Sequence, residues 1–242
     1  MPSREFFRKI LFFTPKNEVD KPTGVCYNKN ALILRFFLKG TNRIMKQMDF
    51  TNCRVVPVVV IQKLEDTLPT LQALCDGGVP VAEITFRTAC AADAIREGVK
   101  AFPDMKIGAG TVINAQQAKD AIAAGATFIV SPGLSPAVAE VCRENDVPYL
   151  PGCVTPTEIM QALELGLTTL KFFPANVYGG LSAIKALSAP FPQVRFLPTG
   201  GVDLSNINEF LACDKIAAVG GSFMMKGDIV ANCKKLIETI NG

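Results

Sequence analysis

The sequence contains no histidine, and this absence narrows the chemistry that the protein can perform. Histidine is the commonest general acid or base in enzymes and the commonest ligand of zinc in catalytic sites. Catalysis by this chain therefore has to use lysine, carboxylate, tyrosine, cysteine or backbone groups. The sequence gives no reason to expect a bound metal or another cofactor.

Three further features are missing, and each excludes a class of protein. The eight cysteines form no CxxC pair and no regular framework, which is typical of reduced thiols in a cytoplasmic protein. No apolar run approaches the roughly 20 residues that cross a bilayer, so we expect no membrane segment. The net charge of +3 predicts no nucleic-acid partner, because such proteins usually carry a strongly basic surface.

Residues 1–50 differ in composition from the rest of the chain. They carry ten Lys or Arg and four Asp or Glu, a net charge of +6, whereas residues 51–242 carry a net charge of −3. We therefore treat 1–44 as an atypical basic leader and 45–242 as the main domain. Three interpretations of the leader stay open: a disordered or partly helical tail, a targeting peptide, or translated sequence before a true start at Met45 or Met48.

From about Thr51 onward, short Val/Ile/Phe-rich runs alternate with Ala/Leu-rich segments whose apolar residues have helical spacing. The predicted strands are Val55–Val60, Val81–Phe86, Lys106–Ala109, Phe128–Ser131, Tyr149–Gly152, Thr169–Phe172, Arg195–Pro198 and Ile216–Gly220. The predicted helices are Thr67–Asp76, Ala91–Ala101, Ala115–Ala124, Pro136–Glu144, Thr157–Leu165, Leu181–Ser188 and Ile229–Ile240. Eight such units predict a compact (β/α)8 TIM barrel. A doubly wound open sheet is the alternative, although no G-x-G-x-x-G follows the first strand.

Polar residues occur where the predicted strands end, and active sites of parallel barrels lie at those carboxyl ends. In "AEITFRT", Glu83 and Arg87 share one parity, while the apolar residues between them take the other. In "TTLKFF", Lys171 has the parity of Thr169 and Phe173, so it can point to the same inner side as Glu83.

A lysine in such a position is suited to covalent catalysis. Burial disfavours its charged form, and a neutral amine attacks a carbonyl to form a Schiff base. Glu83 is then the available proton shuttle, and the planar fork of Arg87 suits a carboxylate. Structural roles are the alternative, because Lys171 could be ion-paired and Glu83 could pair with Arg87.

The last two strands end in glycine pairs, "PTGGV" and "GGSF". Paired glycines let the backbone approach a ligand closely, and phosphate sites of barrels often follow strands seven and eight. These pairs could also be ordinary tight turns. The cysteines, including Cys90 and Cys153, are expected to be small apolar packing residues, since no histidine can activate them. Lys63 and Glu65 look like a solvated loop.

These segments resemble the 2-keto-3-deoxy-6-phosphogluconate (KDPG) aldolase family, class I aldolases of the Entner–Doudoroff pathway. The matching pieces are "VVPVVVIQKLEDTLP", "AEITFRT", "GAGTV", "SPGLS", "LKFFPA", "PQVRFLPTGGV" and "GGSFM", in family order. The resemblance implies a metal-independent carbon–carbon lyase without a cofactor, assembled as a homotrimer. Its substrate would be a phosphorylated 2-keto acid that yields pyruvate and glyceraldehyde 3-phosphate, with 4-hydroxy-2-oxoglutarate as a second substrate.

The resemblance also implies a role for each site residue. Lys171 would form the Schiff base and Glu83 would shuttle protons through water. The remaining candidates would bind substrate: Arg87 and Thr111 at the carboxylate, Phe173 beside the imine, Thr199 as a reader of substrate stereochemistry, and Gly200, Gly201 and Ser222 at the phosphate. Family members commonly begin with a short helix at the barrel bottom, for which residues 41–54 are the only candidate.

Other functions stay open beside this resemblance. A 6-phosphogalactonate aldolase is the nearest competitor, although such enzymes usually lack the threonine and arginine found here at Thr199 and Arg87. A phosphosugar isomerase or synthase would use Glu83 as a base without an imine. A non-catalytic barrel would bind phosphorylated metabolites only.

Overall fold

The computed structural model describes residues 45–51 and 53–242. The predicted leader, 1–44, lies outside the described residues. Within the described part the strands are β1 (Val55–Val59), β2 (Val81–Thr85), β3 (Lys106–Gly110), β4 (Ile129–Val130), β5 (Tyr149–Leu150), β6 (Thr169–Phe172), β7 (Arg195–Pro198) and β8 (Val219–Gly221). The helices are α3 (Thr67–Asp76), α4 (Ala91–Ala101), α5 (Ala115–Ala123), α6 (Pro136–Glu144), α7 (Pro156–Glu164), α8 (Gly180–Ser188), α9 (Ile207–Leu211) and α10 (Ile229–Asn241), with short 3-10 turns η1 (Leu64–Asp66) and η2 (Phe223–Met225).

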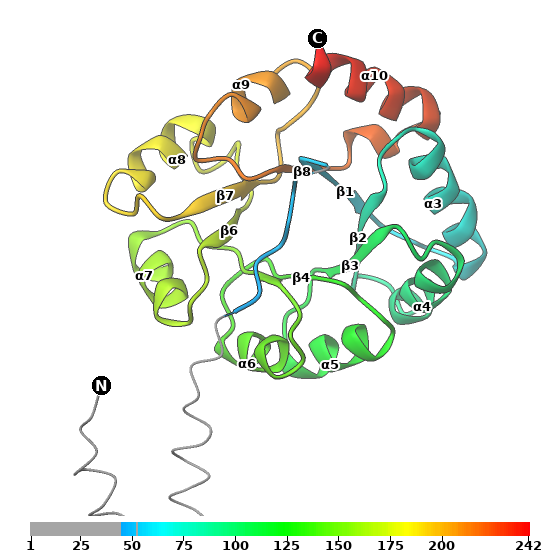
Figure 1. Cartoon of the computed structure of the whole chain (residues 1–242), viewed down its shortest axis with the longest axis horizontal. Coiled ribbons are helices and arrows are strands. Elements are labelled where there is room, and N and C mark those ends of the chain that lie inside the picture. The colour runs from blue at the N-terminus through cyan, green and yellow to red at the C-terminus, as the bar shows by residue number, and fades with distance from the viewer. Residues whose placement is uncertain (1–44, 52) are drawn as a thin grey trace, which may run out of the picture. The chain divides into compact units, whose positions relative to one another are not determined.

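All the paired strands run parallel, in two sheets. Six strands follow the order β5-β4-β3-β2-β1-β8, and β6 pairs with β7. Isolated parallel bridges join the edges of the two sheets: Gly152 to Lys171, Phe196 to Ile216 and Thr199 to Gly220. Figure 1 shows the strands at the centre with the helices around them. The predicted α/β class with parallel strands is confirmed.

The strands are buried on both sides, and their alternating residues divide between two apolar clusters. Ala82 and Ile84 of β2 belong to the large cluster that includes the helices, whereas Val81 faces the other way. The small inner cluster consists of Val56, Val81, Phe128, Val130, Leu150, Leu197 and Ala218. Glu83 shares the parity of Val81, which confirms the predicted inward parity of β2. Gly108 on β3 leaves room for the Phe128 ring, which a Cβ at that position would overlap.

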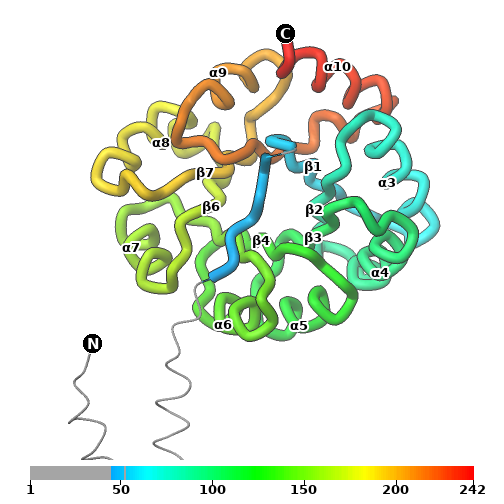
Figure 2. The backbone as a smooth tube through the Cα atoms, in the orientation of Figure 1, coloured from blue at the N-terminus to red at the C-terminus, as the bar shows by residue number. Residues whose placement is uncertain are grey.

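The segment before β1 covers the amino-terminal side of this inner cluster. Met48 and Phe50 pack against the cluster, and the Lys106 ammonium donates a hydrogen bond to the Asp49 carbonyl at 2.8 Å. Figure 2 shows this segment crossing in front of the strands. Residues 45–51 contain no helix, so the helix implied by the family resemblance is absent from the described part of this segment. Extended chain covers the strand ends instead.

The helices that the sequence predicted occur within one or two residues of their expected ends, and capping residues mark where several of them begin. Asn114 and Ser135 cap α5 and α6, and Thr155 forms a capping box with Glu158 at the start of α7. The five-residue helix α9 was not predicted. Lys63 and Glu65 form an exposed ion pair, as expected of a solvated segment, with Lys63 just before the short turn η1 and Glu65 within it. Among the described residues, no helix is both long and apolar enough to cross a membrane.

Candidate active site

The candidate residues meet at the carboxyl ends of the strands, around a cavity of about 350 Å³. Lys171 lies within β6, and Phe173 follows that strand. The other lining candidates follow β2, β3, β7 and β8: Arg87, Thr111, Thr199, Gly200, Gly201 and Ser222. Glu83 lies behind the cavity wall, in contact with Lys171. The structure therefore brings together every site residue that the sequence indicated.

Lys171 and Glu83 form a buried ion pair. The Lys171 Nζ atom lies 3.1 Å from Oε1 and 3.3 Å from Oε2 of Glu83, and the two residues are 6% and 1% exposed. The Nζ atom also lies 5.6 Å from the centre of the Phe173 ring, over its face. Because Lys171 lines the cavity while Glu83 lies behind it, the amine can meet a ligand and still exchange a proton with the carboxylate.

Two glycines make room for this pair and for its neighbours. A Cβ on Gly110 would overlap the Glu83 carboxylate, so only glycine leaves Glu83 in this position beside β3. A Cβ on Gly220 would overlap the Thr199 hydroxyl in the same way. The sequence showed both glycines, but only the structure shows that each faces a candidate side chain.

Arg87 and Thr111 form the second part of the site. The Arg87 Nε atom donates a hydrogen bond to Thr111 Oγ1 at 3.1 Å. Arg87 therefore does not pair with Glu83, which was the alternative, purely structural role considered for these two residues. Thr111 has φ of +55°, a left-handed conformation that β-branched residues rarely adopt and that costs about 1–3 kcal/mol. Strain of this kind clusters at functional sites.

The far end of the cavity offers unpaired donors. Gly200 and Gly201 have φ of +92° and +76°, and their amides donate to no backbone or side-chain acceptor among the described residues. The Thr199 hydroxyl is buried and also lacks a hydrogen-bond partner within the described part of the chain. Buried polar groups are normally paired, so the Thr199 hydroxyl indicates a ligand with acceptor oxygens. The more exposed Gly200 and Gly201 amides lie beside it and could donate to the same ligand.

Sequence reasoning missed two charged residues of the cavity, Asp203 and Lys226. Both follow the glycine pairs closely in the sequence, and that proximity was the available signal.

The expected role of the cysteines agrees with their environment: Cys153 is fully buried, and burial raises its pKa to about 12, which leaves it as a thiol. No group of three or more Cys, Asp or Glu side chains suited to a metal ion occurs within 45–51 and 53–242.

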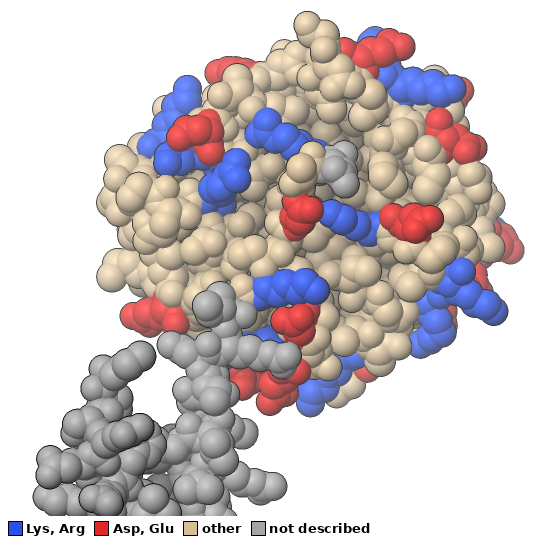
Figure 3. Space-filling model, in the orientation of Figure 1, with Lys and Arg blue, Asp and Glu red and all other residues tan. Residues whose placement is uncertain are grey.

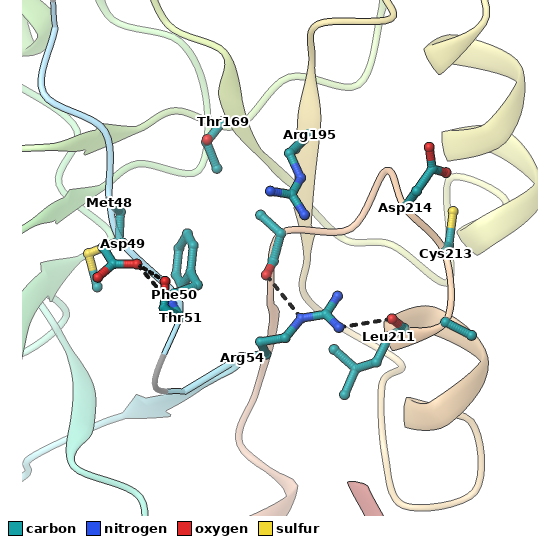
Figure 4. A pocket seen from close by; sticks show the side chains of 12 residues that line it. Met48, Asp49, Phe50, Thr51, Arg54, Thr169, Arg195, Leu211, Cys213 and Asp214 are labelled. Carbon is teal, nitrogen blue, oxygen red and sulfur yellow. Dashed lines mark hydrogen bonds between the residues drawn. The ribbon is translucent and has the colours of Figure 1, made fainter. Parts of the chain in front are cut away.

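A second cavity, of about 500 Å³, lies at the amino-terminal ends of β1, β6 and β7 (Figure 4). Arg54 there donates hydrogen bonds to the carbonyls of Leu211, Ile216 and Ala217 at 3.0, 2.9 and 3.4 Å. Burial lowers the pKa of Arg54, and the neighbouring Arg195 lowers it further. Acidic and basic side chains lie interspersed on the face that Figure 3 shows. None of the predicted catalytic residues lies in this cavity.

Comparison with known proteins agrees with the geometry. The family model described as KDPG and KHG aldolase matches residues 46–239. The chain belongs to this family. It is 45% identical over 178 residues to the 2-dehydro-3-deoxy-phosphogluconate aldolase of Treponema pallidum. This alignment covers 74% of this chain and 85% of that one. It is also 45% identical over 174 residues to the KHG/KDPG aldolase of Escherichia coli, with 72% and 82% covered.

A solved structure of the same family has a similar fold. The KDPG aldolase of Legionella pneumophila, with pyruvate captured at low pH as a covalent carbinolamine intermediate, superposes with a TM-score of 0.72. It is 40% identical and covers 79% of this chain and 94% of that one. Membership of the KDPG and KHG aldolase family therefore rests on sequence and on fold.

Proposed function

We propose that this chain is a Schiff-base aldolase that cleaves 2-dehydro-3-deoxy-6-phosphogluconate to pyruvate and glyceraldehyde 3-phosphate. A second proposed substrate is 4-hydroxy-2-oxoglutarate, which yields pyruvate and glyoxylate. The observation that carries the proposal is the Lys171 amine at the cavity wall, 3.1 Å from a buried carboxylate. The names of the T. pallidum, E. coli and L. pneumophila relatives support the same substrates.

The first half of the reaction forms the imine. Glu83 accepts a proton from Lys171, and the neutral Nζ attacks the C2 keto carbon of the substrate. The resulting carbinolamine loses its hydroxyl as water, with the proton supplied by Glu83, and leaves an iminium between Nζ and C2. A carbinolamine of pyruvate is the species captured in the L. pneumophila relative.

The second half breaks the carbon–carbon bond. The C4 hydroxyl gives its proton through water to the Glu83 carboxylate, and the C3–C4 bond breaks. Its electron pair forms the C2–C3 double bond, and the C=N pair moves onto nitrogen to give an enamine. The aldehyde leaves, Glu83 returns its proton through water to C3 of the enamine, and water hydrolyses the iminium to release pyruvate and free Lys171. No electron donor or acceptor outside the substrate is needed.

The other site residues would orient the substrate. Arg87, held by Thr111, offers its guanidinium to the C1 carboxylate. Phe173 would flank the imine, and the unpaired Thr199 hydroxyl would bind a substrate hydroxyl. The free amides of Gly200 and Gly201, with the Ser222 hydroxyl, would bind the phosphate.

The test is a coupled assay in which lactate dehydrogenase reports released pyruvate. We expect turnover of the phosphogluconate substrate, and none in a Lys171→Met variant. Preferred turnover of the phosphogalactonate epimer would contradict the substrate assignment. Binding of sugar phosphates without pyruvate release would favour a non-catalytic role.

We further propose that the two sheets form one closed (β/α)8 barrel and that 45–242 is the aldolase domain. The three isolated bridges between the sheet edges support closure. From the family resemblance we also propose a homotrimer in the cytoplasm. Light scattering on the purified protein tests the trimer, and a monomer would contradict it.

A further inference from the structure

Lys226 lies at the far end of the active-site cavity, on the side of the glycine pairs. It lines the same cavity as Lys171, Gly200, Gly201 and Ser222. Lys226 is exposed, and it makes no ion pair within 4.0 Å to any carboxylate of the described residues. Within the described part of the chain, Lys226 is therefore a cation of the cavity that no carboxylate contacts directly.

The backbone around Lys226 is fixed although its side chain is exposed. The Asn232 amide donates hydrogen bonds to the carbonyls of Lys226 at 2.6 Å and Met224 at 3.2 Å. Gly227 follows with φ of +73°, and the Asp228 carboxylate then caps α10 by accepting from the Ala231 amide at 2.9 Å. A charge on a fixed backbone loses less freedom when it binds a ligand.

The charges of the cavity are unequal at its two ends. Arg87 can compensate a carboxylate, whereas Gly200, Gly201 and Ser222 offer only neutral donors to a phosphate dianion. Asp203 also lines this end, and hydrogen bonds from the Ser205 hydroxyl and amide hold the pKa of Asp203 below its ordinary value. Its carboxylate therefore stays charged and repels a phosphate, and a cation at the same end would offset this repulsion.

We propose that Lys226 pairs with the phosphate of the substrate and thereby selects phosphorylated substrates over unphosphorylated ones. The proposal rests on the proposed function for the substrate class and extends it to a residue outside the expected site. A lysine suits this position because its ammonium is a compact charge on a flexible stem that can follow a phosphate. Substrates without a phosphate, such as 4-hydroxy-2-oxoglutarate, gain nothing from Lys226.

The experiment compares Lys226→Met with the conservative Lys226→Arg and with Lys234→Met, an exposed lysine of α10 outside the cavity. Each is assayed on the phosphorylated substrate, on 2-keto-3-deoxygluconate and on 4-hydroxy-2-oxoglutarate. For Lys226→Met we expect about a tenfold rise in KM for the phosphorylated substrate alone, the order expected for one partly solvated ion pair. Lys226→Arg should restore most of the affinity, and Lys234→Met should match the parent protein.

Two outcomes would overturn the proposal: an unchanged KM for the phosphorylated substrate, or an equal change for all three substrates, which would indicate a structural role. Calorimetry with glycerol 3-phosphate gives a readout independent of catalysis. We expect weaker binding to Lys226→Met, with a smaller dependence on salt. If the parent protein releases no pyruvate, the proposed function fails, and calorimetry still decides the role of Lys226.

Discussion

The two ends of the strands each carry a cavity, and the two cavities differ in how their polar groups are satisfied. At the amino end, Arg54 donates to three carbonyls, and Asp49 accepts from Thr51 and lies near Lys106. At the carboxyl end, the Thr199 hydroxyl lacks a partner among the described residues. The amino-end cavity is the larger, about 500 against 350 Å³. The buried ion pair and the Thr199 hydroxyl therefore distinguish the candidate active site from the amino-end cavity better than volume does.

The largest expected effect at the carboxyl end follows the loss of the Glu83 base. In Glu83→Gln the side chain keeps its shape and still accepts a hydrogen bond from Lys171, but it no longer takes a proton. We expect kcat to fall by about 10²–10⁴, the usual contribution of a general base. Steady-state kinetics in the coupled assay measure it, with Glu65→Gln as an exposed control. An unchanged kcat would assign proton transfer to another group.

A smaller loss should follow from displacing Glu83 without changing it. Gly110→Ala places a Cβ against the Glu83 carboxylate and shifts it from Lys171. A misplacement of about 1 Å can cost about 10² in rate, so we expect a loss of that order with a folded protein by circular dichroism. Gly133→Ala is the matched control, because its Cβ would meet nothing within 4 Å. Full activity in Gly110→Ala would show that the Glu83 position is not critical.

At the amino end, removing a polar side chain should lower the free energy of unfolding and leave the catalytic rate unchanged. Arg54→Met leaves three carbonyls without their donor, and we expect the free energy of unfolding to fall by about 2–4 kcal/mol. The kcat of the folded protein should not change. Urea unfolding measures the effect, and the exposed Arg195→Met should cost no more than about 0.5 kcal/mol. If Arg54→Met lost activity but kept its free energy of unfolding, the proposed difference between the two ends of the strands would be wrong.

The smallest effect concerns Glu158, a carboxylate whose role is structural. Burial would raise its pKa, but hydrogen bonds from Val154 and Thr155 outweigh burial and hold the pKa of Glu158 below 4.5. Because the folded-state pKa is lowered, this stabilisation is present above pH 4.5 and disappears as the pH falls through the folded value. We expect Glu158→Gln to cost about 1 kcal/mol at pH 7 in urea unfolding, with the difference shrinking in acid. If the difference in the free energy of unfolding between the two proteins were as large in acid as at pH 7, this account would be contradicted.

The sequence predicted most of the strands and helices, and it predicted that Glu83 and Lys171 point inward. Particular residues show the physical reasons. Runs such as "TTLKFF" alternate with period two, so the inward direction of Lys171 followed from its neighbours. Helix ends were predictable where Asn, Ser or Thr could cap them. Helix α9 was missed because five residues with two buried apolar side chains give no clear period.

What the sequence could not give was contact across long separations. The pairing of Lys171 with Glu83 rather than Arg87 with Glu83 depends on how β2 and β6 face each other, and those strands lie 88 residues apart at the contact. The role of Gly110 in making room for Glu83, and the presence of Lys226 in the cavity, likewise depend on which loops meet. The extended covering of the inner cluster by residues 45–51 depends on the packing of Met48 and Phe50.

The most direct test of the central claim is chemical trapping at Lys171. The protein is incubated with pyruvate, reduced with borohydride, digested and analysed by mass spectrometry. We predict a single modified lysine, carrying the mass of a reduced pyruvate imine, in the peptide that contains Lys171, and no adduct in Lys171→Met. An unmodified Lys171 in a protein that still releases pyruvate would contradict the Schiff-base mechanism.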